Sequence, residues 1–158
     1  MRIAGIVRDS IVNGPGIRDV VFFQGCGKRC KGCHNPETWD YMGGCHRFLG
    51  HVVNELAESG NDVTMSGGEP LDQLEDLVEL SRHLKAQGKN IWVYTGNVVD
   101  PTKYIYQVLA QYVDVIVDGR YVEELKDSNL LFRGSSNQRI IDLPKSVKEE
   151  KVILWEEC

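Results

Sequence analysis

Cys26, Cys30 and Cys33 place three thiols within eight consecutive residues, and no other feature of this sequence points as directly to chemistry. Thiolates bind iron–sulfur clusters, and a cluster usually takes four of them. Three closely spaced thiolates leave one iron of a 4Fe–4S cubane without a protein ligand. An open iron can bind a small molecule, as the open position of a catalytic metal does. The spacing therefore predicts a reactive iron–sulfur cluster.

The residues around these cysteines suit a tight loop that surrounds a negatively charged group. Glycine permits the sharp backbone path that closely spaced ligands require. The loop contains Gly25, Gly27 and Gly32. Basic side chains oppose the charge of a thiolate-ligated cluster, and the loop also carries Lys28, Arg29 and Lys31.

A structural zinc site is the alternative interpretation of the same cysteines, with His34 or His46 as the fourth ligand. Zinc prefers closed tetrahedral sites, in which pairs of closely spaced cysteines are common. Such a site usually draws its ligands as two separated pairs, whereas this chain has three thiols in one run. The spacing therefore favours a cluster over zinc.

A second unusual turn is Gly67-Gly68-Glu69, where an apolar strand is expected to end and a helix to begin. Adjacent glycines let the backbone approach a ligand closely. The same residues also fit an ordinary tight turn between a strand and a helix. Because this turn and the cysteine loop each follow a strand, a functional interpretation gains weight.

Strands and helices are expected to alternate along the chain, which predicts an α/β fold with mostly parallel strands. Expected strands cover residues 18–24, 62–66, 90–95, 113–117, 139–143 and 152–155. Expected helices cover residues 48–59, 71–87 and 100–112, the last with Asp100 as N-cap and Pro101 at its first position. In such sheets, ligands gather at the carboxyl ends of strands. The cysteine loop, the Gly-Gly turn and the turns at residues 95–96 and 118–119 are expected there.

Length and composition indicate a single domain over residues 1–158. A net charge of −5 argues against direct nucleic-acid binding, which usually needs a basic face. The sequence shows neither a signal peptide nor an apolar stretch long enough to span a membrane, so we expect a cytoplasmic protein with no membrane contact. Cys45 and Cys158 lie outside the cysteine run, and we expect both to be incidental.

The spacing C-x-x-x-C-x-x-C at Cys26, Cys30 and Cys33 resembles the signature of the radical S-adenosylmethionine superfamily. The resemblance implies a partial (βα) TIM-like barrel. It also implies a 4Fe–4S cluster whose open iron is chelated by the amino and carboxylate groups of S-adenosylmethionine. One electron from the reduced cluster then breaks the sulfonium bond, which yields methionine and a 5′-deoxyadenosyl radical.

The same resemblance implies cofactor-binding roles for two segments. The turn at residues 67–69 matches the superfamily's GGE motif, whose backbone contacts the methionine amino group. Gly32, Cys33 and His34 lie where the cluster loop passes the cofactor. Many members carry an aromatic residue just before the third cysteine, where this chain has Gly32. His34 is therefore the candidate for packing against the adenine.

Further segments narrow the resemblance: NGPGIR at residues 13–18, CHNPETW at 33–39, VDGRY at 117–121 and RGSSNQR at 133–139. Together they resemble the activating proteins of anaerobic (class III) ribonucleoside-triphosphate reductases, over about residues 11–142. This resemblance implies that the radical removes a hydrogen atom from one backbone glycine of the large catalytic subunit of the reductase. It also implies flavodoxin or a similar one-electron donor.

Two other functions remain open. One is another small radical enzyme, either a different glycyl-radical activase or a 7-carboxy-7-deazaguanine synthase type, which the RGSSNQ segment disfavours. The other is a zinc-binding interaction module without enzymatic activity. The polar side chains of residues 133–138 either satisfy a buried turn or contact a partner or the cofactor.

Overall fold

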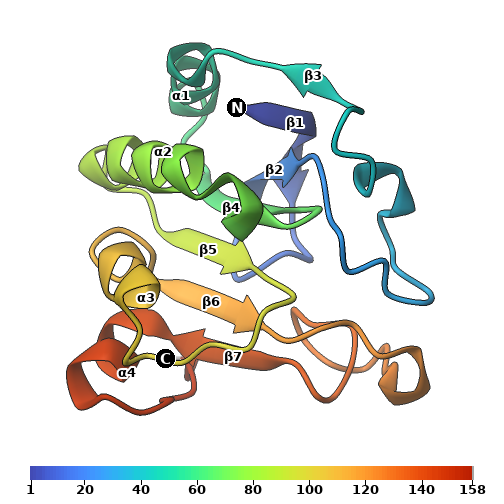
Figure 1. Cartoon of the computed structure of the whole chain (residues 1–158). Helices are drawn as coiled ribbons and strands as arrows, with labels where there is room; N and C mark the ends of the chain where they lie inside the picture. Colours follow the sequence, from blue (N-terminus) through green and yellow to red (C-terminus); the bar gives the residue numbers. More distant parts are fainter. Residues whose placement is uncertain (158) are drawn as a thin grey trace.

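The computed structural model describes residues 1–157 and contains one seven-stranded β-sheet (Figure 1). Its strands are β1 (Arg2–Ser10), β2 (Arg18–Phe23), β3 (Cys45–His46), β4 (Asp62–Gly67), β5 (Ile91–Tyr94), β6 (Val115–Asp118) and β7 (Arg139–Asp142). Their order across the sheet is β3-β1-β2-β4-β5-β6-β7. The central strands β2, β4, β5 and β6 pair in parallel, so their carboxyl ends meet at one rim.

The outer strand pairs are antiparallel: β1 with β2, β3 with β1, and β7 with β6. Five of the seven strands therefore run in the same direction, which confirms the expected α/β fold with a mostly parallel sheet. Within residues 1–157, β3 and β7 do not pair with each other, so the sheet is open. The finer expectation of a partial TIM-like barrel stays a prediction.

All four α-helices cover the same face of the sheet (Figure 1). They are α1 (Leu49–Ala57), α2 (Leu74–Ala86), α3 (Tyr104–Leu109) and α4 (Leu143–Glu149). Each contributes to one apolar core with the strands, in which Leu56, Leu80, Leu109 and Leu143 are fully buried. Burial of one such side chain stabilises the fold by about 1.5–3 kcal/mol. This core holds the parallel strands, and with them the rim at their carboxyl ends.

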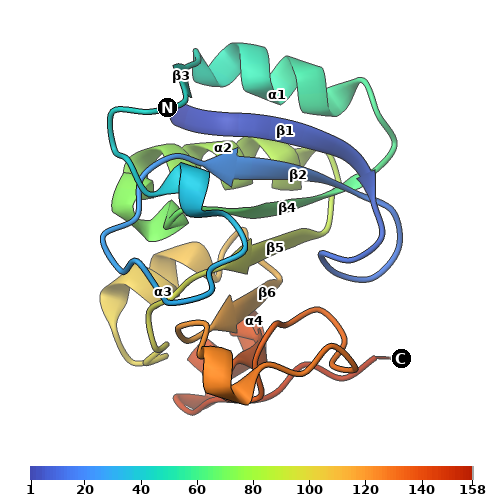
Figure 2. The same ribbon diagram turned by 90° about the vertical axis from the view of Figure 1, so that its right-hand side faces the viewer.

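The opposite face of the sheet is covered by loops, which lie in front of the strands in Figure 2. A smaller buried cluster forms there around Trp92, Val115 and Val117. The Trp92 ring centre lies 5.6 Å from that of Phe132 and 5.0 Å from that of Trp155. Aromatic contacts therefore anchor the segment between β6 and β7, and the C-terminal segment, to this face.

Arg18, at the start of β2, fixes the loop that precedes it. The side chain is only 1% exposed, and its guanidinium donates to the Thr64 hydroxyl at 2.8 Å and to two backbone carbonyls on neighbouring segments. It also lies 5.5 Å from the centre of the Trp92 ring. Burial lowers the pKa of Arg18 to about 10, so the group stays charged at neutral pH. Thr64 in turn donates to the Asn13 carbonyl, which holds that residue beside the rim.

Most expected elements are confirmed. The first five expected strands correspond to β2, β4, β5, β6 and β7. The first two expected helices correspond to α1 and α2, and a short 3₁₀ helix over Pro70–Gln73 precedes α2. Apolar runs predicted these strands, and amphipathic spacing predicted these helices. Both patterns were reliable because the apolar residues of these elements pack in the main core.

The third helix begins later than expected, and the assignment of Asp100 and Pro101 to its start was wrong. The Asp100 carboxylate accepts from the amide and the hydroxyl of Thr102, which closes a separate turn. Lys103 then has extended backbone angles and is the N-cap of α3. A local side-chain hydrogen bond thus replaced the helical start.

The strand expected over residues 152–155 was also wrong, because Leu154 makes only an isolated bridge with Ile141. Two strands and one helix were not expected: β1, the two-residue β3, and α4. In β1, Gly5 interrupts the apolar pattern and Ile3 is the buried residue of an otherwise exposed or half-buried strand. In α4, the Asp142 carboxylate accepts from the amide of Lys145, which is a recognisable N-cap.

Two cysteines are not part of the expected signature. Cys45 is exposed on β3, and Cys158 lies outside the described residues.

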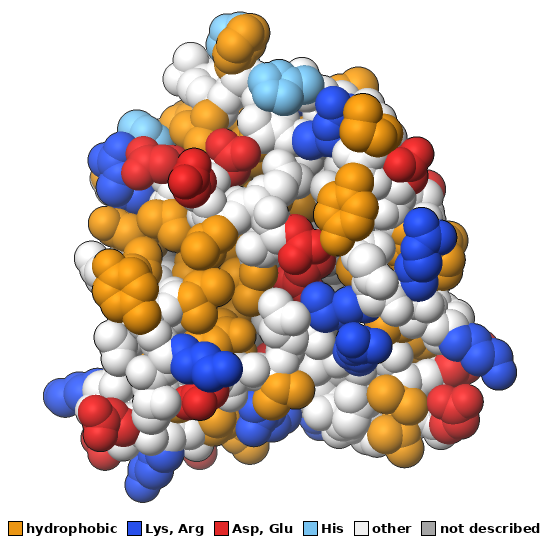
Figure 3. Space-filling view, in the orientation of Figure 1, with side chains coloured by type: hydrophobic (Ala, Val, Ile, Leu, Met, Phe, Trp, Pro, Cys, Tyr) orange, Lys and Arg blue, Asp and Glu red, His pale blue; other side chains and the backbone are white. Residues whose placement is uncertain are grey.

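No helix within residues 1–157 has both the length and the apolar character needed to cross a bilayer. On the face shown in Figure 3, acidic and basic side chains are interspersed rather than segregated.

Candidate functional site

A cavity of about 200 Å³ lies at the carboxyl ends of β2, β4, β5 and β6. Each of these strands is followed by a turn that contributes to its wall: residues within 26–39, 66–69, 94–96 and 119–121. Parallel strands bring the turns after them to one rim, as the alternation of elements along the sequence predicted. The four turns named from the sequence are thus neighbours in space.

The three cysteines of the signature all line this cavity and are partly buried. Their loop is held to the chain that follows it, because the amide of Gly25 donates to the Thr38 carbonyl at 2.7 Å. The amide of Asn35 lies 3.4 Å from the sulfur of Cys33 and donates to it. This contact fixes the position of the Cys33 sulfur relative to the chain that follows it.

Thiolates are the donors that iron–sulfur clusters take, so the three cysteines fit such a cluster. Within residues 1–157, no group of three or more Cys, His, Asp or Glu side chains converges closely enough to hold one metal ion. Zinc needs its ligands around a single point, whereas a cluster takes its thiolates at separate irons. His46 lies on β3, outside the lining of the cavity. Of the two histidines named for a zinc site, only His34 therefore lines the cavity with the three cysteines.

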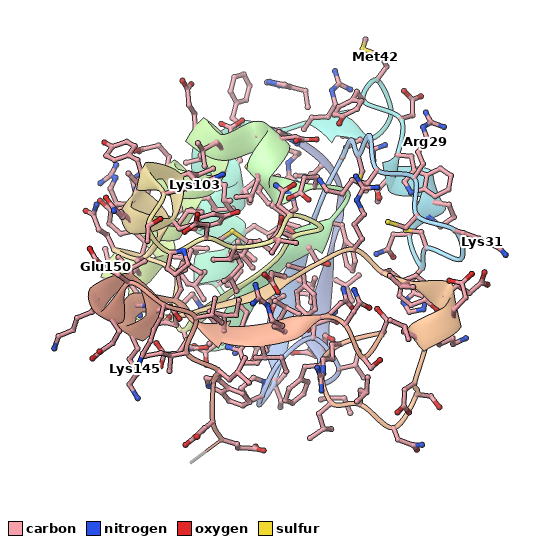
Figure 4. The ribbon with its side chains drawn as sticks, turned by 60° about the horizontal axis from the view of Figure 1, so that its bottom comes forward. Arg29, Lys31, Met42, Lys103, Lys145 and Glu150 are labelled. Carbon is pink, nitrogen blue, oxygen red and sulfur yellow. The ribbon has the colours of Figure 1, made fainter. Side chains whose placement is uncertain are left out.

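The basic side chains of the loop point in different directions. Lys28 is directed into the cavity and is 16% exposed. The Arg29 guanidinium lies 5.6 Å from the centre of the Trp39 ring. Lys31 is 82% exposed, extends into solvent (Figure 4) and pairs with Glu123 at 3.6 Å. Only Lys28 of these three therefore has a buried partner.

The two glycines of the second turn approach the cysteine loop. Gly67 has φ 106°, a conformation that favours glycine. A Cβ atom on Gly68 would lie 2.3 Å from the carbonyl oxygen of Gly25. The amide of Glu69 donates to this same carbonyl at 2.9 Å. The close approach that adjacent glycines permit is therefore, in this structure, an approach to the residue that precedes Cys26.

The carboxylate of Glu69 is 1% exposed and lies at the centre of a hydrogen-bond network. One oxygen accepts from the Thr95 hydroxyl at 2.8 Å and from the Leu71 amide at 3.1 Å. The other accepts from the Gly96 amide at 2.8 Å and from the Lys28 ammonium at 2.9 Å. Glu69 thus joins the cysteine loop to the ends of β4 and β5.

Gly32 and His34 face the segment between β6 and β7. The His34 ring centre lies 5.0 Å from that of Tyr121. Gly32 has φ 76°, and a Cβ atom there would lie 2.8 Å from the Glu123 carboxylate. An aromatic residue before Cys33 would therefore require both a strained backbone and a displaced Glu123. This is a physical reason for the glycine at this position.

The polar side chains of residues 133–138 satisfy turns within the same segment. Gln138 accepts from two of the segment's own amides at 3.0 and 3.1 Å and donates to the Gly119 carbonyl at 3.1 Å. Asn137 donates to the Arg120 carbonyl at 2.8 Å. Gln138 and Asn137 thus satisfy turns, as the first of the two interpretations expects, and Gln138 also lines the cavity.

Three residues of the site were not singled out as site residues from the sequence: Lys28 as the partner of Glu69, Tyr121 beside His34, and Tyr94. The Tyr94 hydroxyl donates to the Phe132 carbonyl, and burial raises the pKa of Tyr94, so it stays protonated. Their positions just after strands, or at the end of one, indicated that they lie near the site. Their contact partners are distant in the sequence, and the sequence pattern does not show which residues meet.

Comparison with known proteins finds similarity over most of the chain. The family model described as "4Fe-4S single cluster domain" matches residues 12–141. The anaerobic ribonucleoside-triphosphate reductase-activating protein of Escherichia coli (strain K12) is 36% identical over 138 residues, which cover 81% of this chain and 90% of that protein. The protein of the same name from Enterobacteria phage T4 is 38% identical over 138 residues, which cover 82% of this chain and 86% of that protein.

A relative with a different name is the pyruvate formate-lyase-activating enzyme of Clostridium pasteurianum. It is 35% identical over 165 aligned residues, which cover 98% of this chain and 66% of that enzyme. The range matched by the family model contains the cysteine loop, the Gly-Gly turn and residues 133–138. All the features described around the cavity thus fall within the region of similarity.

Proposed function

Because this chain belongs to the 4Fe-4S single cluster domain family and to the anaerobic ribonucleoside-triphosphate reductase-activating proteins, we propose that it activates such a reductase. It is a radical S-adenosylmethionine enzyme that generates a glycyl radical in the large catalytic subunit. The observation that carries the proposal is the meeting of the three thiols and the Glu69 carboxylate at one cavity.

Cys26, Cys30 and Cys33 are the proposed ligands of a 4Fe–4S cluster. When bound, the reduced cluster supplies one electron, which cleaves S-adenosylmethionine into methionine and a 5′-deoxyadenosyl radical. The chain's own contribution is to hold three thiolates in a partly buried loop and to leave one coordination position for the cofactor. The Asn35 amide donates a hydrogen bond to the sulfur of Cys33.

The turn at residues 67–69 is the proposed binding site for the amino acid portion of S-adenosylmethionine. Glu69 offers a buried carboxylate, whose oxygens accept hydrogen bonds from N–H groups. Residues 32–34 are proposed to line the rest of the cofactor site. His34 packs against Tyr121 and offers the adenine a flat surface.

The proposed substrate is a backbone glycine of the reductase. The 5′-deoxyadenosyl radical takes one hydrogen atom from its Cα, which leaves 5′-deoxyadenosine and a glycyl radical. We propose flavodoxin or a similar protein as the source of the electron and the cytoplasm as the compartment. A partial TIM-like barrel remains part of the proposal, with the loop-covered face of the open sheet as its inner side.

The test is an anaerobic assay of the reconstituted protein with dithionite and S-adenosylmethionine, in which 5′-deoxyadenosine is measured by chromatography. We expect product from the parent protein and a loss of at least about a hundredfold from Cys30→Ala, because the cluster loses a ligand. Cys45→Ala is the matched control, since Cys45 is exposed on β3 and should leave the product yield unchanged. Equal product from Cys30→Ala and the parent would contradict the assignment of the ligands.

A second candidate function is activation of pyruvate formate-lyase, because the relative with that name aligns with 98% of this chain. The two functions differ only in the protein that receives the radical. Each candidate partner is therefore added to the same anaerobic mixture, and the glycyl radical is recorded by electron paramagnetic resonance. A signal in the reductase alone supports the first proposal, whereas a signal in the lyase alone replaces it with the second.

A further inference from the structure

The ring of Tyr41 lies against the two glycines that flank Cys26. A Cβ atom on Gly25 would overlap the ring, and one on Gly27 would lie 3.4 Å from the Tyr41 hydroxyl oxygen. Because glycine has no side chain, neither sequence neighbour of Cys26 can cover the loop at this point. Tyr41 occupies the place where a side chain at Gly25 would lie.

Hydrogen bonds hold Tyr41 in this place from two sides. Its hydroxyl donates to the Asp72 carboxylate at 2.6 Å, and Asp72 lies in the 3₁₀ helix that follows the Gly-Gly turn. A hydrogen bond to a charged acceptor is stronger than one between neutral groups. The backbone beside Tyr41 is fixed by the buried Gln24, whose side-chain amide donates to the Asp40 carbonyl at 2.7 Å. Tyr41 therefore ties the cysteine loop to the turn after β4.

The other face of the Tyr41 ring is in contact with water. Tyr41 is 50% exposed, whereas Cys26 is partly buried. Arg29 and Met42 are also exposed and extend into solvent on this side of the molecule (Figure 4). Tyr41 thus stands between solvent and the backbone of residues 25–27.

Shielding of a ligand loop from water affects the reduction potential of the cluster that the loop would hold. Reduction adds one negative charge to a cluster that thiolates already make negative, and water stabilises this additional charge. Exclusion of water therefore lowers the reduction potential and makes the reduced cluster a stronger reductant. The proposed function, reductive cleavage of S-adenosylmethionine, requires a strong reductant.

We propose that Tyr41 is a positioning residue of the cluster site, whose ring shields the loop at Cys26 from water and thereby keeps the reduction potential of the cluster low. This inference rests on the proposed cluster ligands. Tyr41 is not itself a ligand, and it acts through the backbone of residues 25–27. The ring provides the shielding, and the bond to Asp72 adds to its stability.

The experiment measures the midpoint potential of the reconstituted cluster in Tyr41→Leu, which removes the ring and keeps an apolar side chain. The protein is titrated anaerobically with redox mediators, and the reduced cluster is recorded by electron paramagnetic resonance. We expect a shift of about tenfold in the equilibrium toward the reduced cluster, which is about 59 mV for one electron. Iron and sulfide content and circular dichroism show which variants retain cluster and fold.

The cluster-free protein provides an independent measurement of the same shielding. Iodoacetamide alkylates accessible thiols, and mass spectrometry gives the rate at each cysteine. In Tyr41→Leu we expect Cys26 to react about threefold faster than in the parent, because the cover of its loop is gone. Cys45, exposed on β3, is the internal reference in the same molecule.

Two further variants separate the effect of the ring from other effects. Tyr104→Leu makes the same substitution at a tyrosine that is 78% exposed on α3 and lies outside the lining of the cavity, so its potential should match that of the parent. Tyr41→Phe keeps the ring and removes the bond to Asp72. Its equilibrium should stay within about twofold of that of the parent.

The outcomes distinguish the competing explanations. An unchanged potential in Tyr41→Leu with a verified cluster overturns the proposal and makes Tyr41 a brace of the surface turn. A shift in Tyr41→Phe as large as that in Tyr41→Leu also overturns it, because the ring would then not be the cause. If Tyr41→Leu folds without retaining a cluster, faster alkylation of Cys26 supports the proposal and an unchanged rate overturns it. If the parent protein forms no 4Fe–4S cluster, the proposed function itself fails, and this inference fails with it.

Discussion

The carbonyl oxygen of Gly25 is the point at which the two sequence signatures meet. It accepts the Glu69 amide at 2.9 Å, and it leaves no space for a Cβ atom on Gly68. The residue before Cys26 therefore has its position set by the turn after β4. The geometry of the three thiols depends on two glycines that are not themselves proposed metal ligands.

Substitution of Gly68 should therefore damage cluster binding. In Gly68→Ala the new methyl group would lie 2.3 Å from the Gly25 carbonyl oxygen, so one of the two turns must move. We expect a loss of about 1–3 kcal/mol in the free energy of unfolding of the cluster-free protein, measured with urea. We also expect lower iron and sulfide content after anaerobic reconstitution.

Gly60 provides the matched control for this substitution. A Cβ atom on Gly60 meets nothing within 4 Å, and its φ lies outside the left-handed region. Gly60→Ala should therefore change stability by no more than about 0.5 kcal/mol and leave cluster content unchanged. Full iron content in Gly68→Ala would show that the turn after β4 does not set the cysteine loop.

The site was predictable from the sequence to the extent that its residues are local. The run from Cys26 to Cys33 is a local pattern, and so is Gly67-Gly68-Glu69, and both line the cavity. The pairs Lys28–Glu69 and His34–Tyr121 join segments far apart in the chain. No periodicity or composition encodes such a pair, because it exists only once the strands have set the rim.

Among the elements, the segment between β6 and β7 has little regular structure and closes one side of the cavity. It contains only a short 3₁₀ helix over Glu123–Leu125, and much of it is exposed. Gln138 holds it together, since its amide group bonds the segment's own backbone and the Gly119 carbonyl. A segment with few apolar anchors depends strongly on such bonds.

Gln138→Ala should loosen this segment. Three hydrogen bonds are lost, and we expect a loss of about 1–2 kcal/mol in the free energy of unfolding. Limited trypsin digestion should cut faster after Lys126, which is exposed within the segment. Asn137→Ala is the control, because that exposed side chain makes a single bond to Arg120. Equal cleavage rates in both variants would assign the rigidity of the segment to other contacts.

The elements that the sequence predicted well are those whose apolar residues face the main core. β5 is short, apolar and mostly buried, and β6 is apolar and buried up to its last residue, Asp118, so their patterns are unambiguous. β1 escaped detection because it pairs at the outer side of β2 and buries little besides Ile3. The start of α3 was misplaced because Asp100 bonds Thr102 locally, a competition that propensity alone does not decide.

For the molecule as a whole, the end opposite the cavity is held by a buried carboxylate. Asp19 near the start of β2 accepts from Ser59 at 2.6 Å and from Asn61 at 2.9 Å, and it pairs with Arg8 at 3.1 Å. These partners belong to β1 and to the connection between α1 and β4. Asp19 therefore fastens three parts of the fold at the amino ends of the strands, far from the thiols.

The pH dependence of stability should report this residue. Burial alone raises the pKa of Asp19, but the hydrogen bonds from Asn61, Ser59 and the Asp9 amide, with the charge of Arg8, outweigh it and hold the pKa below its usual value. The carboxylate therefore stabilises the fold above its unfolded pKa. That stabilisation is lost as the pH falls through the lower folded value.

Urea unfolding of the cluster-free protein between pH 7 and pH 3 tests this expectation. Asp19→Asn should be less stable by about 1–3 kcal/mol at pH 7, because it loses a charged acceptor in a buried network. Its stability should also fall less steeply below about pH 5 than that of the parent. Parallel pH profiles for the two proteins would show that Asp19 does not contribute to acid unfolding.

The walls of the cavity come from opposite ends of the chain, with the thiols on the loop after β2 and the facing wall between β6 and β7. Synthesis proceeds from the N-terminus, so a chain still on the ribosome exposes its three cysteines before Tyr121 has been made. Exposed thiolates are the ones most readily oxidised. We therefore expect the cluster to be inserted after synthesis of the chain is complete. A chain that ends before Tyr121 would leave the three cysteines exposed to oxidation.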